Sequence, residues 1–152
     1  MEANDRSIAG FTMLGHGLVH WFEMSIPILL VVWRDSFDIS LTFVGFVVAL
    51  GYVPFGLWAL PAGTLTDRVG PRRVVLAALA GMTGSFLLLA LAPSAPAVAG
   101  ALFLWGVTAS LYHPAGNALI STGAQRRGTV FAYHGMAGNV GIALGPFTAA
   151  VL

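Results

Sequence analysis

The sequence has no cysteine and no lysine, and it carries very little charge of either sign. Only 9% of its 152 residues are charged, whereas 57% are hydrophobic, and the mean hydropathy is +0.85. A soluble domain has roughly a quarter of its residues charged. The shortage of charge therefore indicates an integral membrane protein. The missing cysteine excludes disulfides, thiolate metal sites and cysteine nucleophiles.

Several motifs that define other classes of protein are also missing. There is no basic stripe to contact phosphates, so nucleic acid is excluded as a partner. There is no HExxH pair, nucleophile elbow or acidic metal cluster, so we predict that the chain is not an enzyme and has no cofactor. There is no phosphate-binding loop, which favours gradient coupling over ATP hydrolysis. The first residues, MEANDRSIAG, lack the basic start and cleavage site of a secretory signal.

The gaps between charged residues predict an all-α transmembrane fold with five spans. The expected spans are residues 7–33, 41–62, 74–92, 98–120 and 129–152, with the sequence PSAPA separating the third from the fourth. Six arginines then fall on one side and Arg34 on the other, so the positive-inside rule predicts a cytoplasmic N-terminus in the cell membrane. The last span stops at AAVL without a polar tail. We interpret the chain as the truncated N-terminal piece of a longer protein.

One stretch, GTLTDRVGPRRVV at residues 63–75, gathers four of the thirteen acidic and basic residues. An ordinary positive-inside loop would explain its arginines but not the order of its residues. Gly63 and Gly70 should permit a tight turn, and Pro71 should begin the next helix. Asp67 and the arginines could form charge-assisted hydrogen bonds at the membrane face. The ordered residues are Gly63, Leu65, Asp67, Arg68, Gly70, Arg72 and Arg73.

This order resembles the signature between helices 2 and 3 of the major facilitator superfamily. Pro71 stands where many members have a basic residue. The resemblance implies the N-terminal five helices of a six-helix bundle, which is half of a twelve-helix transporter that rocks about a central cavity. It also implies that this gate motif binds the C-terminal bundle, absent from this chain, and favours the outward-open state. The implied partners are a small-molecule substrate, protons and the lipid bilayer.

A second motif, GMAGNVGIALGP, lies in the last expected span. Its small residues recur every three or four positions and would make a flat face for close helix packing. Gly138, Gly141, Gly145 and Pro146 carry this motif, which resembles the helix-5 motif of exporters in the superfamily. Ala149 and Ala150 replace the glycine pair that usually follows, and plain close packing explains the same residues. We expect this face to have no partner within the chain.

The branch of the superfamily is suggested by three segments. The pattern HxxxHxxE in the first span, SLYHPAGNALIS in the fourth and RRGTVFAYHGMAGNVGIALGP in the fifth resemble the fosmidomycin-resistance branch, whose members export a small phosphonate antibiotic. GNVG also resembles a helix of nitrate/nitrite porters, but no arginine lies inside a span to hold an anion. We therefore expect proton-coupled efflux of small organic molecules. The alternatives are an uptake carrier for a small anion or metabolite, and a non-transporting scaffold or sensor.

Ionisable residues inside the spans are the candidate functional site. His16, His20 and Glu23 share one helix face. They could form a proton-coupling or substrate site, a structural hydrogen-bond cluster, or a transition-metal site in which Glu23 is a third ligand; the preferred prediction assigns no metal. His113 and Asn117 are further candidates, because Pro114 should break the fourth helix beside them. His134 is expected to be hydrated near the cytoplasmic start of the last span.

Overall fold

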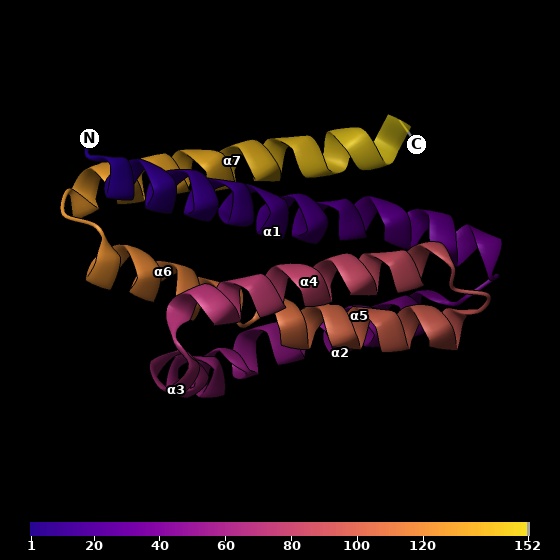
Figure 1. Ribbon diagram of the computed structural model, residues 1–152. Coiled ribbons are helices and arrows are strands. Elements are labelled where there is room, and N and C mark those ends of the chain that lie inside the picture. The colour runs from indigo at the N-terminus through magenta and orange to yellow at the C-terminus, as the bar shows by residue number, and fades with distance from the viewer. Residues whose placement is uncertain (152) are drawn as a thin grey trace.

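The chain folds into a bundle of helices. The computed structural model describes residues 1–151, and this part contains seven helices and no strand (Figure 1). Leu152, the predicted end of the last span, lies outside the described residues. The all-α fold is confirmed. The helices are α1 (Ala3–Ser36), α2 (Leu41–Leu57), α3 (Ala59–Val69), α4 (Pro71–Ala90), α5 (Ala95–Ala109), α6 (Tyr112–Gly123) and α7 (Arg127–Val151).

The seven helices make five passes along one axis, because two predicted spans are each broken into two helices. Helices α2 and α3 are bent by 45° at Trp58, and α5 and α6 together form a 29-residue apolar segment. A proline follows each break, Pro61 three residues after Trp58 and Pro114 four residues after Ser110. Pro61 has no N–H to give to Leu57, and Pro114 has none to give to Ser110. The segment predicted as the second span, residues 41–62, thus contains a bend, and after the bend the helix continues to Val69.

Length and composition identify only some of these passes as membrane spans. Within residues 1–151, three segments are long and apolar enough to cross a membrane, namely Ala3–Ser36, Pro71–Ala90 and Ala95–Gly123, and the bent pair α2–α3 makes a fourth if it counts as one span. Helix α7 is not among them, because its glycines and polar residues lower its hydropathy. Its 25 residues exceed the roughly 20 that a crossing needs. The fifth span stays a prediction.

The connections alternate between two ends of the bundle. The N-terminus, the α3–α4 junction and the α6–α7 connection lie at one end, whereas the α1–α2 and α4–α5 connections lie at the other (Figure 1). Six arginines therefore belong to one end and Arg34 to the other. Helix α1 has 34 residues and is about 51 Å long, which exceeds a hydrocarbon core of about 30 Å. The helix thus extends beyond the hydrocarbon, and its first residues precede the span predicted at residues 7–33.

The glycines of α7 pack directly on α1, which is its principal neighbour. A methyl group on Gly141 would overlap the carbonyl oxygen of Gly17, and one on Gly145 would lie 2.7 Å from the carbonyl oxygen of Trp21. Ser25 donates a hydrogen bond to the Gly145 carbonyl at 3.1 Å. The expectation that this glycine face has no partner within the chain is therefore wrong. A close approach of two backbones, as at other small-residue helix interfaces, explains the motif.

The remaining helices form the larger part of the apolar core. Trp105 on α5 is fully buried against Tyr52 and Phe55 on α2, with ring centroids 5.4 and 5.5 Å apart. Gly106 allows α5 to approach α2, because a methyl group there would overlap the carbonyl oxygen of Gly51. Helix α4 packs on α5 and α6. This core holds α6 firmly beside α1, where the polar residues of the bundle meet.

The gate motif at residues 63–73 is largely helical rather than a loop. Gly63 lies inside α3 and makes no turn, so the role predicted for it is wrong. Gly70 alone makes the turn, with a φ of 94°, and Pro71 begins α4 as predicted. Within the part of the chain that the structure describes, Asp67 and the arginines of the motif form no ion pair or side-chain hydrogen bond, and they are exposed.

Candidate functional site

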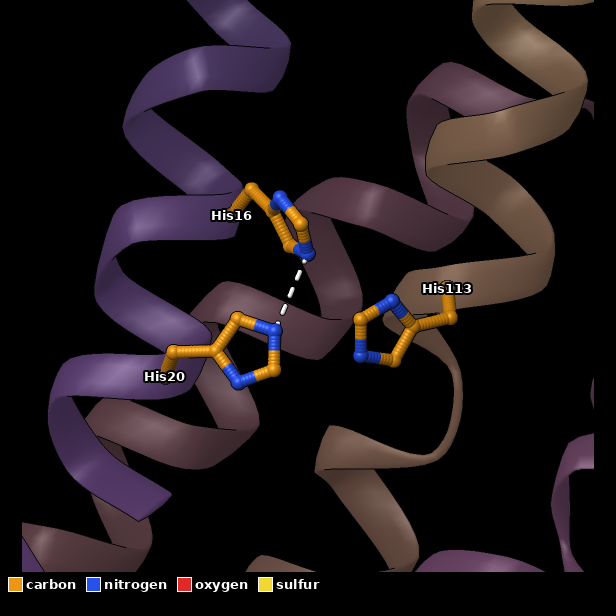
Figure 2. Close-up of side chains that lie close together, drawn as sticks. All are labelled: His16, His20 and His113. Atoms are coloured by element: carbon orange, nitrogen blue, oxygen red, sulfur yellow. Dashed lines mark hydrogen bonds between the residues drawn. The ribbon is translucent and has the colours of Figure 1, made fainter. Parts of the chain in front are cut away.

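All four histidines of the chain meet between α1, α6 and α7. His16 and His20 come from α1, His113 from α6 and His134 from α7. The His16 ring centroid lies 4.7 Å from that of His20, 5.2 Å from His113 and 3.9 Å from His134. We call these four residues the histidine cluster. Figure 2 shows three of them, with the rings of His16, His20 and His113 pointing toward one another.

Small residues and one tyrosine make room for the cluster. A methyl group on Gly138 would lie 2.6 Å from the His16 ring, and one on Gly15 would collide with the Tyr112 ring. Tyr112 is fully buried and donates its hydroxyl hydrogen to the carbonyl oxygen of Thr12 at 2.6 Å. Glycine at these two positions therefore lets aromatic rings from α1 and α6 fill the space between the helices.

The hydrogen bonds of His16 fix its tautomer. Its Nδ1 lies 2.8 Å from the carbonyl oxygen of His134, and a carbonyl can only accept. His16 Nδ1 therefore carries a hydrogen. In a neutral ring, Nε2 then has a free lone pair. His20 Nε2 lies 3.0 Å from His16 Nε2, so His20 is the donor in this second bond (Figure 2).

The contact between His20 and Glu23 requires a second proton, in addition to the one that His20 gives to His16. His20 Nδ1 lies 2.7 Å from Glu23 Oε2, and this contact is the only acid–base pair in residues 1–151. Because His20 Nε2 already carries a hydrogen, the contact needs a second proton, either on Nδ1 or on the carboxyl group. The pair is thus drawn as an imidazolium with a carboxylate, or as a neutral imidazole with a carboxylic acid. Tyr52 donates to the backbone carbonyl of Glu23 at 3.3 Å and holds α2 beside the pair.

The structure brings together most of the predicted site residues. His113 joins His16 and His20, although about a hundred residues separate them in the sequence. Asn117 is exposed, and within residues 1–151 its side chain makes no hydrogen bond. The expected hydration of His134 is wrong: it is 5% exposed, it stacks on His16, and its Nδ1 donates to the Thr12 carbonyl at 3.2 Å. The contact between His134 and His16 could not be predicted, because the two residues lie far apart in the sequence.

The chain matches the family model of the Major Facilitator Superfamily over residues 12–152, which is most of its length. This chain belongs to the major facilitator superfamily. It is a multi-pass membrane protein of a transporter family. The resemblance to the fosmidomycin-resistance branch stays a prediction.

Curated relatives of this superfamily chain are named only as transporters. It is 34% identical over 86 residues to the uncharacterized MFS-type transporter YceJ of Bacillus subtilis, covering 57% of this chain and 22% of the relative. It is 30% identical over 133 residues to the uncharacterized MFS-type transporter Rv0849 of Mycobacterium tuberculosis, covering 86% of this chain and 32% of the relative. The chain thus spans a third or less of the length of these relatives. No solved structure matches it.

The exposed motif of this superfamily chain borders a groove. A hollow of about 460 Å³ is lined by Arg68, Trp58 and Pro61 of the α2–α3 region and by Leu111 at the α5–α6 break. It lies beside both interrupted spans, and none of the four histidines lines it. The groove beside the gate motif and the histidine cluster are therefore separate features of this fold.

One polar contact of this superfamily chain was not predicted from its sequence. Asp5, at the start of α1, accepts hydrogen bonds from the backbone N–H groups of Gln125 at 2.9 Å and Arg126 at 3.0 Å. The neighbouring Asn4 donates to the carbonyl of Gly123 at 2.9 Å. These contacts hold the start of α1 against the end of α6 and the start of α7, where a carboxylate also interacts favourably with the helix dipole.

Proposed function

We propose that this chain is part of a secondary transporter that exports small organic molecules through the cell membrane in exchange for protons. Membership of the superfamily supports transport in general. The observation that supports proton coupling is the ordered chain of hydrogen bonds from the His134 carbonyl through His16 and His20 to Glu23. That chain contains one proton more than neutral imidazoles and an ionised carboxylate would supply.

A proton at this pair changes the charge of the bundle centre. A lone carboxylate at mid-membrane costs about 2.5–3.5 kcal/mol by insertion scales, so an unpaired Glu23 would be unfavourable there. While the pair holds its extra proton, the centre is neutral overall. Loss of that proton leaves a net negative charge and removes a hydrogen bond. The protonation of the pair and the binding of a substrate beside it would therefore influence one another.

The proposed direction of transport and the proposed class of substrate are based on two resemblances. Gly141, Gly145 and Pro146 resemble the helix-5 motif of exporters, and the segments around His113 and His134 resemble the branch that exports a phosphonate antibiotic. Six arginines at the N-terminal end of the bundle support a cytoplasmic N-terminus by the positive-inside rule. The exposed Asp67 and its neighbouring arginines would then pair with a C-terminal bundle on the cytoplasmic side.

The proposal is tested with the intact protein in everted membrane vesicles, using fosmidomycin as the probe. Proton export driven by the probe is followed with a pH-sensitive dye. We expect the parent to respond, and Glu23→Gln to lose at least about tenfold in rate, because the shared proton and its charge-assisted bond are gone. Glu2→Gln, at an exposed acid, serves as the matched control and should behave as the parent.

Two results would contradict the proposal. A parent that moves no protons in response to fosmidomycin would rule out this substrate with this coupling. A Glu23→Gln variant with the parent's rate and the parent's dependence on the proton gradient would rule out Glu23 as the coupling residue.

A further inference from the structure

We propose that His16, His20 and His113 form a binding site for one divalent transition-metal ion of the Zn²⁺, Co²⁺ and Ni²⁺ class. Nothing in the family assignment or in the names of the relatives implies such a site. It does not depend on the proposed transport cycle, because equilibrium binding to the resting protein is sufficient to establish it.

The geometry is that of three convergent ligands. One nitrogen from each ring can be chosen such that all three atoms lie within 4.8 Å of one another. His16 Nε2 and His20 Nε2 are already 3.0 Å apart. In a tetrahedral site with metal–nitrogen bonds of about 2.0–2.1 Å, two ligand nitrogens are about 3.3–3.4 Å apart. Small side-chain rotations therefore bring all three nitrogens to bonding distance of a single ion.

Two of the three ligands are already oriented as metal-binding histidines usually are. Such a histidine gives its other ring N–H to a backbone carbonyl or a carboxylate, which fixes the tautomer and makes the bonding nitrogen more basic. His16 does this with the His134 carbonyl at 2.8 Å, and His20 faces the Glu23 carboxyl group at 2.7 Å. Glu23 is thus a supporting partner of His20. The interpretation that Glu23 is itself the third ligand does not agree with this position.

The third ring, that of His113, differs from the other two in its hydrogen bonding. Within residues 1–151, neither nitrogen of His113 has a hydrogen-bond partner, although the residue is only partly exposed and its ring lies 5.2 and 5.4 Å from those of His16 and His20. Figure 2 shows the His113 ring turned toward the other two. An imidazole inside a bundle that lacks a partner yet points at two others is suited to donate a lone pair to an ion.

The ligand set determines the class of ion. Three imidazoles with no thiolate favour zinc, cobalt, nickel or copper over magnesium and calcium, which prefer oxygen ligands. A three-histidine site also leaves the fourth position of a tetrahedral ion open to water or another ligand. The ion needs lone pairs on all three nitrogens, so it takes the place of the hydrogen that His20 Nε2 gives to His16. The Glu23 carboxylate then offsets part of the added charge.

The test is metal binding by the intact protein, purified in detergent without a polyhistidine tag and freed of metal. Zn²⁺ is titrated by calorimetry, and Co²⁺ is added as an optical probe. We expect one ion per chain, and intense visible Co²⁺ bands typical of four-coordinate nitrogen ligation. His113→Gln and His20→Gln should each weaken binding at least about tenfold, since even the loss of a supporting partner costs 10–100-fold. Glu2→Gln, at an exposed acid outside the cluster, should bind as the parent does.

The outcomes separate the alternatives. No saturable binding by the parent, a weak octahedral Co²⁺ spectrum, or unchanged affinity in His113→Gln would overturn the site, as would an equal loss in Glu2→Gln. Size-exclusion profiles identify a variant that has failed to fold, and the Co²⁺ spectrum of the parent then decides alone. Metal binding can be found or refuted whether or not the protein exports fosmidomycin, so this test and the transport test fail independently.

Discussion

At the scale of single residues, Asp5 shows how one side chain outside the hydrocarbon can fix the relative positions of three helices. Its carboxylate accepts from the backbone N–H groups of Gln125 and Arg126, and these bonds hold the pKa of the Asp5 carboxyl below its ordinary value. A carboxyl whose pKa is lowered by folding stabilises the folded state above its unfolded pKa of about 3.9. That stabilisation is lost as the pH falls through the lower folded value.

Replacement of Asp5 should therefore have an effect that depends on pH. We expect Asp5→Ala to lower the melting temperature of the detergent-solubilised protein at pH 7, and the difference from the parent to shrink as the pH falls below about 4. Glu2→Ala is the control, since Glu2 is exposed and makes no capping bond with its side chain. A constant difference between pH 7 and pH 3 would show that the carboxylate bonds are not the cause.

Some residues of the candidate site could be predicted from the sequence, and others could not. His16, His20 and Glu23 are predictable because they lie on one helix face. His134 and Asp5 are not, because their partners lie about 120 residues away. Their neighbours in the sequence say nothing about which helix will pack against them. Only the packing of α7 on α1 brings these residues to their partners.

At the scale of elements, the α3–α4 turn depends on one glycine. Gly70 has a φ of 94°, which side-chain-bearing residues rarely adopt, whereas Gly63 sits within α3 with open space around it. We expect Gly70→Ala to destabilise the protein by about 1–3 kcal/mol. Gly63→Ala should be neutral or stabilising by up to about 1 kcal/mol, because alanine is the better helix former. Thermal unfolding of the two variants distinguishes them; similar losses would contradict this division of roles.

Prolines show why the helix boundaries could be predicted only in part. Pro27, Pro54 and Pro146 lie inside helices that continue past them, whereas Pro61 and Pro114 follow breaks. Each of the five removes the same backbone donor. The outcome depends on whether neighbouring helices and side chains stabilise the altered backbone, which is a tertiary property. The charge gaps therefore located the helical segments, but not the interruptions within two of them.

At the scale of the whole molecule, the two ends of the bundle should face opposite sides of the membrane. The chain has no cysteine, so single cysteines can be introduced without background labelling. We expect Gln125→Cys, between α6 and α7, to react with an impermeant maleimide only from the cytoplasmic side. Asp38→Cys, in the α1–α2 turn, should react only from the outside. Labelling of both positions from one side of intact cells would contradict the arrangement of passes, and a reversed pattern would contradict the cytoplasmic N-terminus.

The interrupted spans have a mechanical consequence. Helix α2 packs on α5 and α3 packs on α6, so each crossing consists of two short rods in series, with the joints close together. A swing of the α3–α6 half would require backbone rotation near Trp58 and near Ser110 and Leu111. It would also break the hydrogen bonds that tie α6 to α1, from Tyr112 to Thr12 and from Asn4 to Gly123. His113 is the second residue of α6. Such a swing would change the distance from the His113 imidazole to His16 and His20, so the bend of the fourth pass and the geometry of the histidine cluster would be coupled.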